Sequence, residues 1–205
     1  MKKILFSPKI QKDNHGQLGQ FLDLSWINFF KNKVDLITWN PKNKKFNYKF
    51  AFDGIVISGG NDLYSIKKNK ENFIRDQFEI KLLKFGIKNS LPIIAVCRGF
   101  QFVNHYFGGD FQKTQNHVKK NQKIEFKKNL LFFQKNQILN VNSYHNYKIK
   151  NLSNNFINIA QANDGSTEIA YSKKFKILGL MFHPERKNVS QSNINKLIYK
   201  FFKIK

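Results

Sequence analysis

The stretch LPIIAVCRGFQFVNHYFGG, residues 91–109, joins an apolar run to a segment with helical spacing and holds the only cysteine of the chain. The run PIIAVC predicts a buried strand over 92–97, and GFQFVNHYFGG predicts a short helix over 99–109. Cys97 therefore lies where a strand turns into a helix. This position suits two roles: the thiol could be a nucleophile, or it could be a small buried side chain that only packs in the core.

Two features of the turn suit a nucleophile. A thiol is mostly protonated at neutral pH, and both a helix N-terminus and an imidazole favour its reactive thiolate form. A sharp strand-to-helix turn also needs small neighbours, and Ala95 and Gly99 flank Cys97 on either side. The alternative is a buried cysteine that packs as a small apolar residue. The segment AVCRG alone leaves both interpretations open.

The pattern outward from this stretch predicts an α/β fold in one domain over residues 1–205. Continuous apolar strands that alternate with helices are typical of a parallel sheet with helices on both faces, and the second half favours an antiparallel extension. The predicted strands cover 2–7, 34–40, 52–60, 92–97, 123–128, 130–143, 156–163, 167–174 and 176–183, and the predicted helices cover 18–32, 71–89, 99–109 and 190–204.

Composition limits the possible partners and setting. The formal net charge is +23, but the excess is nearly all lysine spread along the chain, and there are three arginines. This favours a solvated lysine surface and a preference for anionic small ligands over a nucleic-acid interface. A single cysteine favours a reducing, cytoplasmic setting. No apolar run is long enough for a signal peptide or a membrane span. No cluster has metal-ligand spacing, so we expect no metal and no cofactor.

Three predicted strands end in polar or glycine clusters: Ser58-Gly59-Gly60, Cys97-Arg98-Gly99 and His183-Pro184-Glu185. In an open α/β sheet, sites form beyond the carboxyl ends of the strands. A parallel sheet would therefore bring these clusters together, although they are far apart in the sequence.

The third and first clusters could complete a catalytic group around Cys97. His183 and Glu185 are two residues apart, so on an extended segment both side chains point the same way and the carboxylate can reach the ring. Such a carboxylate orients a catalytic imidazole. Gly59 and Gly60 allow a backbone N–H to approach a substrate oxygen closely. The alternatives are a histidine beside a surface acid and a plain turn.

The motifs ISGGND (57–62), AVCRGFQ (95–101), VNSYHN (141–146) and LGLMFHPE (178–185) resemble the class I glutamine amidotransferase superfamily, with its flavodoxin-like fold. CRG, RDQFE (75–79), VNSYH and AQANDGSTEIAY (160–171) resemble its γ-glutamyl hydrolase branch.

This resemblance implies a role for each matching residue. Cys97 would attack a γ-glutamyl carbonyl, His183 would transfer protons, and Glu185 would orient His183. The N–H groups of Gly60 and Arg98 would hold the oxyanion. The expected substrate contacts are Gly59, Gln101, Ser143, Tyr144 and His145. Arg75, Asp76, Glu79 and His117 also lie at motif positions, but no role is assigned to them.

The resemblance implies a cysteine hydrolase that releases L-glutamate from a small γ-glutamyl amide through a thioester, acting as a monomer or homodimer. The short, lysine-rich chain resembles the branch members that hydrolyse γ-glutamyl-CDP-amidate in capsule phosphoramidate synthesis, so this anionic compound is the first expected substrate. The alternatives are γ-glutamyl-γ-aminobutyrate hydrolysis, the glutaminase subunit of an amidotransferase, and a catalytically inactive binding fold. An intact Cys97, His183 and Glu185 argues against the last.

Overall fold

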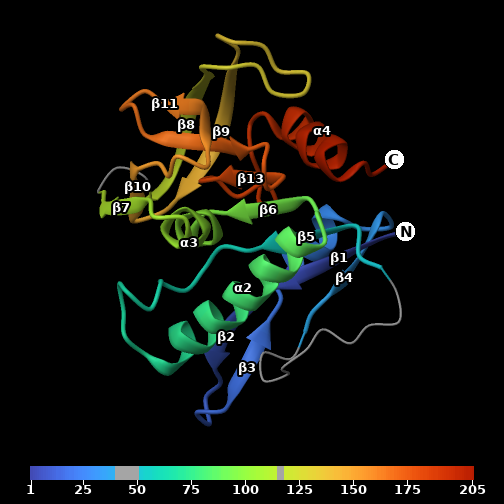
Figure 1. Ribbon diagram of the computed structural model, residues 1–205, viewed down its shortest axis with the longest axis vertical. Helices are drawn as coiled ribbons and strands as arrows, with labels where there is room; N and C mark the ends of the chain where they lie inside the picture. Colours follow the sequence, from blue (N-terminus) through green and yellow to red (C-terminus); the bar gives the residue numbers. More distant parts are fainter. Residues whose placement is uncertain (40–50, 115–117) are drawn as a thin grey trace.

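The computed structural model describes residues 1–39, 51–114 and 118–205 (Figure 1). Its strands are β1 (Lys2–Ser7), β2 (Lys9–Lys12), β3 (Leu18–Phe21), β4 (Val34–Ile37), β5 (Gly54–Ile57), β6 (Ile93–Val96), β7 (Asp110–Lys113), β8 (Val118–Phe126), β9 (Ile138–Tyr144), β10 (Tyr147–Asn151), β11 (Ile157–Ala162), β12 (Thr167–Ser172) and β13 (Ile177–Leu180). Its helices are α1 (Leu24–Phe29), α2 (Lys70–Lys88), α3 (Arg98–Tyr106) and α4 (Gln191–Phe202).

Nine of these strands form one sheet in the order β4-β1-β5-β6-β13-β12-β11-β8-β9. Figure 1 shows β8 and β9 in the upper part of the molecule and β1 and β4 near its middle, while the hairpin of β2 and β3 forms the lower end. The first five strands in this order pair in parallel, and the remaining strands pair antiparallel. The prediction of a parallel sheet with an antiparallel extension is confirmed.

The parallel half of the sheet positions the site. Within it, β5 pairs with β6 and β6 pairs with β13, so these three strands are neighbours and end at the same edge. Ser58, Cys97 and His183 follow directly or closely after their ends. The three clusters identified in the sequence therefore meet at one edge of the sheet.

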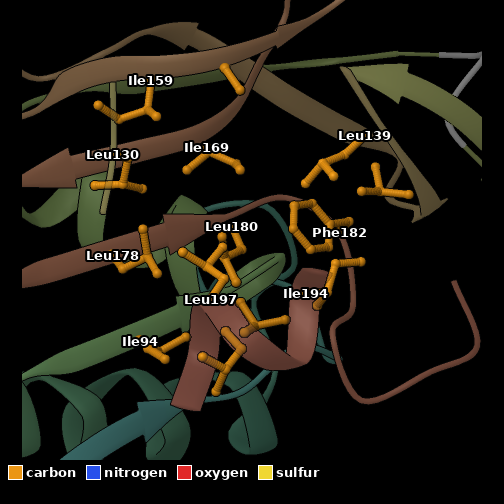
Figure 2. Packing of buried hydrophobic residues seen from close by; sticks show 14 of the residues in the cluster. Ile94, Leu130, Leu139, Ile159, Ile169, Leu178, Leu180, Phe182, Ile194 and Leu197 are labelled. Carbon is orange, nitrogen blue, oxygen red and sulfur yellow. The ribbon is translucent and has the colours of Figure 1, made fainter. Parts of the chain in front are cut away.

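Helices cover both faces of the parallel strands. Alternate strand residues point to opposite faces, and the buried residues divide accordingly into two clusters. On one face, Ile94 and Leu178 pack with residues of α1 and α4. On the other face, Ile55 and Ile93 pack with residues of α2 and α3. Figure 2 shows Ile194 and Leu197 of α4 pointing toward Leu178, Leu180 and Phe182.

The helix predicted over 18–32 is wrong at its start. Residues 18–21 form β3, which pairs with β2 in a separate two-stranded sheet that the sequence analysis missed. The Asp13 side chain accepts the N–H groups of His15 and Gln17, and Gly16 has φ +78°, so a tight turn reverses the chain here. Asp23 then caps α1 by accepting the N–H of Ser25.

The single strand predicted over 130–143 is also wrong in its first half. Residues 130–137 form turns, in which Leu130 and Phe133 are bridged, and the strand β9 begins only at Ile138. Leu130 and Phe133 are buried against the sheet, so an apolar run packs here without being a strand. The small sheet of β7 and β10 was not predicted either.

Two earlier expectations fall partly outside the described residues. His117 lies in the undescribed range 115–117, and Asn40, at the end of the strand predicted over 34–40, lies in the range 40–50. Among the helices of the described ranges, none is long and apolar enough to cross a membrane.

Candidate active site

Cys97 lies in the turn between β6 and α3, in an uncommon backbone conformation. Its φ of 51° lies in the left-handed region, which a residue with a side chain rarely adopts. The turn is held by hydrogen bonds on both sides: the Cys97 N–H donates to the Leu180 carbonyl at 2.6 Å, and the Cys97 carbonyl accepts from Phe100 and Gln101 at 3.0 Å each. The surrounding strands and helix therefore hold the thiol at the N-terminus of α3.

Gly99 explains how α3 lies so close to the sheet. A Cβ atom on Gly99 would lie 2.2 Å from the backbone oxygen of Ile57 in β5. Any larger residue would push the first turn of α3 away from β5. The small residue that we expected near a nucleophile, Gly99, is therefore also required for α3 to pack against β5.

His183 and Glu185 form a buried pair. The His183 Nδ1 lies 2.7 Å from Glu185 Oε1, and both side chains are almost fully buried. This confirms that the two-residue spacing brings the carboxylate to the ring. A carboxylate at Nδ1 leaves Nε2 to face a reacting group.

A clamp of two asparagines fixes the backbone of His183. Asn142 of β9 accepts the His183 N–H at 2.9 Å and donates to the His183 carbonyl at 2.8 Å. Asn188 also donates to this carbonyl, at 3.0 Å, and accepts the Asn142 N–H at 2.8 Å. The antiparallel extension thus positions the imidazole that the parallel sheet brings to the site.

Cys97 and His183 change each other's protonation. Burial favours the neutral form of each group, but their mutual attraction and side-chain hydrogen bond act in the opposite direction. For His183, burial is outweighed by the charges of Glu185 and Cys97, which raise its pKa to about 9. For Cys97, burial is outweighed by His183, so the pKa of the thiol is lowered. The geometry therefore favours a thiolate at Cys97 beside an imidazolium at His183.

The glycine turn after β5 faces this pair. Gly60 has φ +79°, a conformation that favours glycine, and the following Asn61 has φ 58°. Gly59 lies against the imidazole, since a Cβ there would come within 2.5 Å of His183 Cε1. Both glycines are therefore needed for a turn that approaches the site closely.

A pocket of about 130 Å³ opens over the thiol, and Gly60, Cys97, Arg98 and His183 line it. Of the expected substrate contacts, the lining includes Gln101, Tyr144 and His145, whereas Ser143 is fully buried in β9 and is not part of the lining. Gly59 lines a smaller cavity on the other side of His183.

Two of the expected substrate-binding residues, Gln101 and His145, interact with neighbouring residues of the protein. Gln101 donates to the Tyr147 carbonyl at 2.9 Å. His145 is buried with its Nε2 3.6 Å from Glu168. Burial lowers the pKa of His145, but the hydrogen bond and charge of Glu168 outweigh it and raise that pKa overall.

The sequence alone did not predict a role for Arg186, Asn142 or Asn188. The Arg186 guanidinium lies over the Tyr144 ring, 4.6 Å from its centroid, and lines the pocket. Its position directly after Glu185 was an available signal. Asn142 lies within the motif VNSYHN, but its hydrogen bonds to His183 and those of Asn188 join distant segments and leave no local pattern. Within the described ranges, no group of three or more His, Cys, Asp or Glu residues could hold a metal ion.

A thiol and an imidazole that line one pocket, with a carboxylate bound to the imidazole, can be compared with the sites of known proteins. The sequence pattern of the Peptidase C26 family matches residues 36–185. This chain belongs to the Peptidase C26 family. Its fold is that of class I glutamine amidotransferases.

Relatives of this Peptidase C26 member include the γ-glutamyl-CDP-amidate hydrolase of Campylobacter jejuni, which is 29% identical over 184 residues and is matched over 87% of each chain. The glutamine amidotransferase-like protein YvdE of Lactococcus lactis is 34% identical over 188 residues, covering 78% of this chain and 79% of YvdE. A glutamine amidotransferase from Thermotoga maritima has the same fold, with a TM-score of 0.66 and 18% identity over 98% of this chain and 82% of its own. These comparisons support a γ-glutamyl amide hydrolase or a glutamine amidotransferase-like function.

Proposed function

We propose that this Peptidase C26 member hydrolyses a γ-glutamyl amide through a thioester on Cys97, and that its substrate is γ-glutamyl-CDP-amidate. The observation that carries this proposal is that Cys97 and His183 line the same pocket and that Glu185 is bound to the His183 ring. A packing cysteine needs neither a positive φ nor a buried imidazole and carboxylate beside it.

In the first step, the Cys97 thiolate attacks the γ-carbonyl carbon, and the carbonyl oxygen becomes an oxyanion. The N–H groups of Gly60 and Arg98, which both line the pocket, stabilise this charge. His183 gives its proton to the nitrogen of the leaving amine, the C–N bond breaks, and the glutamyl group remains as a thioester.

In the second step, neutral His183 accepts a proton from water while the water oxygen attacks the thioester carbon. The C–S bond breaks, L-glutamate is released, and the thiolate and imidazolium are restored. Glu185 holds the imidazole and stabilises its charged form in both steps.

Two observations support CDP-amidate as the leaving group: the similarity to the C. jejuni hydrolase and the positive charge at the pocket. Arg186 lines the pocket, and the Lys9 side chain packs against Gly60. The Arg98 guanidinium pairs with Glu79 and Asp76, so Arg186 is the better candidate to bind a diphosphate. Asp62 also lines the pocket and offsets part of this positive charge.

The test compares kcat/KM for γ-glutamyl-CDP-amidate, γ-glutamyl-aminobutyrate and glutamine at low and high salt. We expect a preference for the nucleotide that weakens with salt, because contacts between exposed charges are screened. Glutamine should be poor, since it lacks remote groups that help to position the carbonyl. A preference for glutamine would identify a glutaminase, and a preference for aminobutyrate would identify that hydrolase instead.

Arg186→Gln provides the residue-level arm of this test. Loss of one charge-assisted contact should raise KM for γ-glutamyl-CDP-amidate about tenfold and leave KM for γ-glutamyl-aminobutyrate unchanged. Because Arg186 Nε also lies 3.8 Å from Glu185 Oε1, kcat is measured for both substrates, and an effect through Glu185 should lower both values equally. Lys187→Gln is the matched control, because it removes the same charge from the exposed neighbouring side chain. Equal effects of the two variants would show that only net charge matters.

A further inference from the structure

Arg75 of α2 is fully buried directly behind the glycine turn. Its guanidinium donates to three successive backbone carbonyls, those of Ser58 at 2.7 Å, Gly59 at 3.1 Å and Gly60 at 2.5 Å. It also donates to Asn61 Oδ1 at 2.9 Å. One buried side chain therefore sets the orientation of consecutive peptide groups in this turn.

The direction of these carbonyls determines the direction of the N–H groups. In a trans peptide the C=O and N–H bonds point in opposite directions, and the described chain contains no cis peptide bond. Since the Gly59 carbonyl points at Arg75, the N–H of Gly60 in the same peptide group points away from Arg75. Gly60 lines the pocket and Arg75 does not, so the N–H that points away from Arg75 is the one that can face the pocket.

The second proposed oxyanion donor, Arg98, is tied to the same group of charges. Its side chain binds Glu79 and Asp76 of α2. Glu79 in turn accepts from Arg75 Nε at 2.9 Å and from Ser7 Oγ at 2.6 Å. Glu79 thus links the side chain of Arg75, behind Gly60, to the side chain of Arg98, which follows Cys97.

The ion pairs of this cluster join two arginines to two carboxylates, Glu79 and Asp76, so the charges of these four side chains sum to zero. Asp62 adds a further negative charge near Arg98. Burial lowers the pKa of Arg75 to about 9, which still leaves the guanidinium charged at neutral pH. A charged donor that loses its acceptors in the interior is costly, and replacement of one partner removes that balance.

From these contacts we infer that Arg75, Glu79 and Arg98 form a positioning network that holds the two backbone donors of the oxyanion hole. Reversal of the Gly59–Gly60 peptide would turn its N–H away from the pocket and leave the Arg75 guanidinium without that acceptor. The network makes this reversal unfavourable, so the hole is formed before substrate arrives. The inference rests on the proposed acyl-transfer function and assigns a role to residues outside the catalytic group.

The experiment separates two reactions of Cys97. Alkylation by iodoacetamide needs a thiolate but forms no oxyanion, whereas acylation by p-nitrophenyl acetate or γ-glutamyl p-nitroanilide forms one. Arg75→Lys keeps the charge, but one ammonium nitrogen replaces the three guanidinium nitrogens that donate from fixed positions to Ser58, Gly60 and Glu79. We expect its acylation rate to fall roughly 10²–10³-fold, as for loss of an oxyanion donor, with KM little changed. Its alkylation rate should stay within about threefold of the parent rate.

Two further variants complete the experiment. Glu79→Gln keeps the shape but weakens both arginine contacts, so acylation should again fall much more than alkylation even if Arg75→Lys does not fold. Asn104→Ser is the control, because Asn104 holds a separate buried network at the far end of α3 through the carbonyls of Asp110 and Asn151. It should lower stability but leave the ratio of acylation to alkylation unchanged.

The outcomes distinguish this inference from the proposed function. If the parent protein releases no glutamate from any γ-glutamyl compound, but Arg75→Lys and Glu79→Gln still slow acylation by p-nitrophenyl acetate selectively, the network stands and the proposed function fails. If acylation and alkylation fall together, or neither falls, the positioning role is overturned. A parent that is alkylated but never acylated would overturn both.

Discussion

Burial and the mutual attraction of Cys97 and His183 together decide the protonation of these two groups. Burial alone would keep both neutral, since the interior disfavours charge, yet each stabilises the charged form of the other. The pair should therefore lose its reactive form as pH rises through about 9, where His183 gives up its proton.

The first residue-scale prediction concerns the thiol. In the parent protein, the rate of Cys97 alkylation by iodoacetamide should rise with pH around a midpoint below the ordinary thiol value of 9.0. His183→Ala removes the stabilising charge but leaves the burial, so the midpoint should move upward. A midpoint that does not move would mean that His183 does not stabilise the thiolate.

The second residue-scale prediction ranks the two partners of the thiol. Glu185→Gln keeps an acceptor beside His183 Nδ1 but removes the charge, so the base stays present and is poorly oriented. We expect kcat to fall by up to about 10⁴-fold, less than for His183→Ala, which removes the base itself. Steady-state rates for the two variants on one γ-glutamyl substrate decide the order. A silent Glu185→Gln would reduce the catalytic group to a Cys–His pair.

At the scale of elements, the contact between α3 and β5 sets the position of the Cys97 thiol. Gly99→Ala would place a Cβ against the Ile57 backbone oxygen, which cannot rotate away as a side chain could. The first turn of α3 must then shift and carry Cys97 with it. We expect about 1–3 kcal/mol of destabilisation, a Tm lower by roughly 2–12 °C, and a lower kcat.

The matched control for this variant is Gly19→Ala, because no atom lies within 4 Å of the Cβ that it would add. Thermal unfolding followed by circular dichroism, together with kcat at 25 °C, measures both effects. Equal behaviour of the two variants would show that the close contact between α3 and β5 is not required.

The hairpin of β2 and β3 shows how an element missed in the sequence affects the site. It brings Lys9 against Gly60, and Lys9 and Phe21 line the small cavity beside His183 and Glu185. Residues 18–21 are exposed along the whole of β3, so their apolar spacing did not indicate a buried helix face.

At the scale of the whole molecule, the net charge of +23 should oppose folding through the mutual repulsion of the lysines. Salt screens such repulsion, so Tm should rise between 0.01 and about 0.3 M NaCl, over which the Debye length falls well below 30 Å. Lys128→Glu, at an exposed position, should raise Tm in low salt and have less effect in high salt. A Tm that falls with salt would show that attractive ion pairs dominate instead.

The amino-acid sequence by itself determined the elements whose signals are local. Buried parallel strands such as 92–97, the helix over 71–89 and the two-residue spacing of His183 and Glu185 follow from periodicity and backbone geometry, which act within a few residues. The sharp turn at Cys97 could be anticipated for the same reason, since the small residue at 99 stands beside it in the chain.

Only the tertiary structure decided the contacts between distant segments. The clamp of Asn142 and Asn188 on His183, and the contact of Arg75 with the turn at 58–60, join residues that are separated along the chain by up to 46 positions. Such polar groups are satisfied by whichever partner the fold brings within hydrogen-bond distance, and that choice has no period in the sequence. The same holds for residues 130–137, where the packing of Leu130 and Phe133 against the sheet overrode the strand-forming tendency of an apolar run.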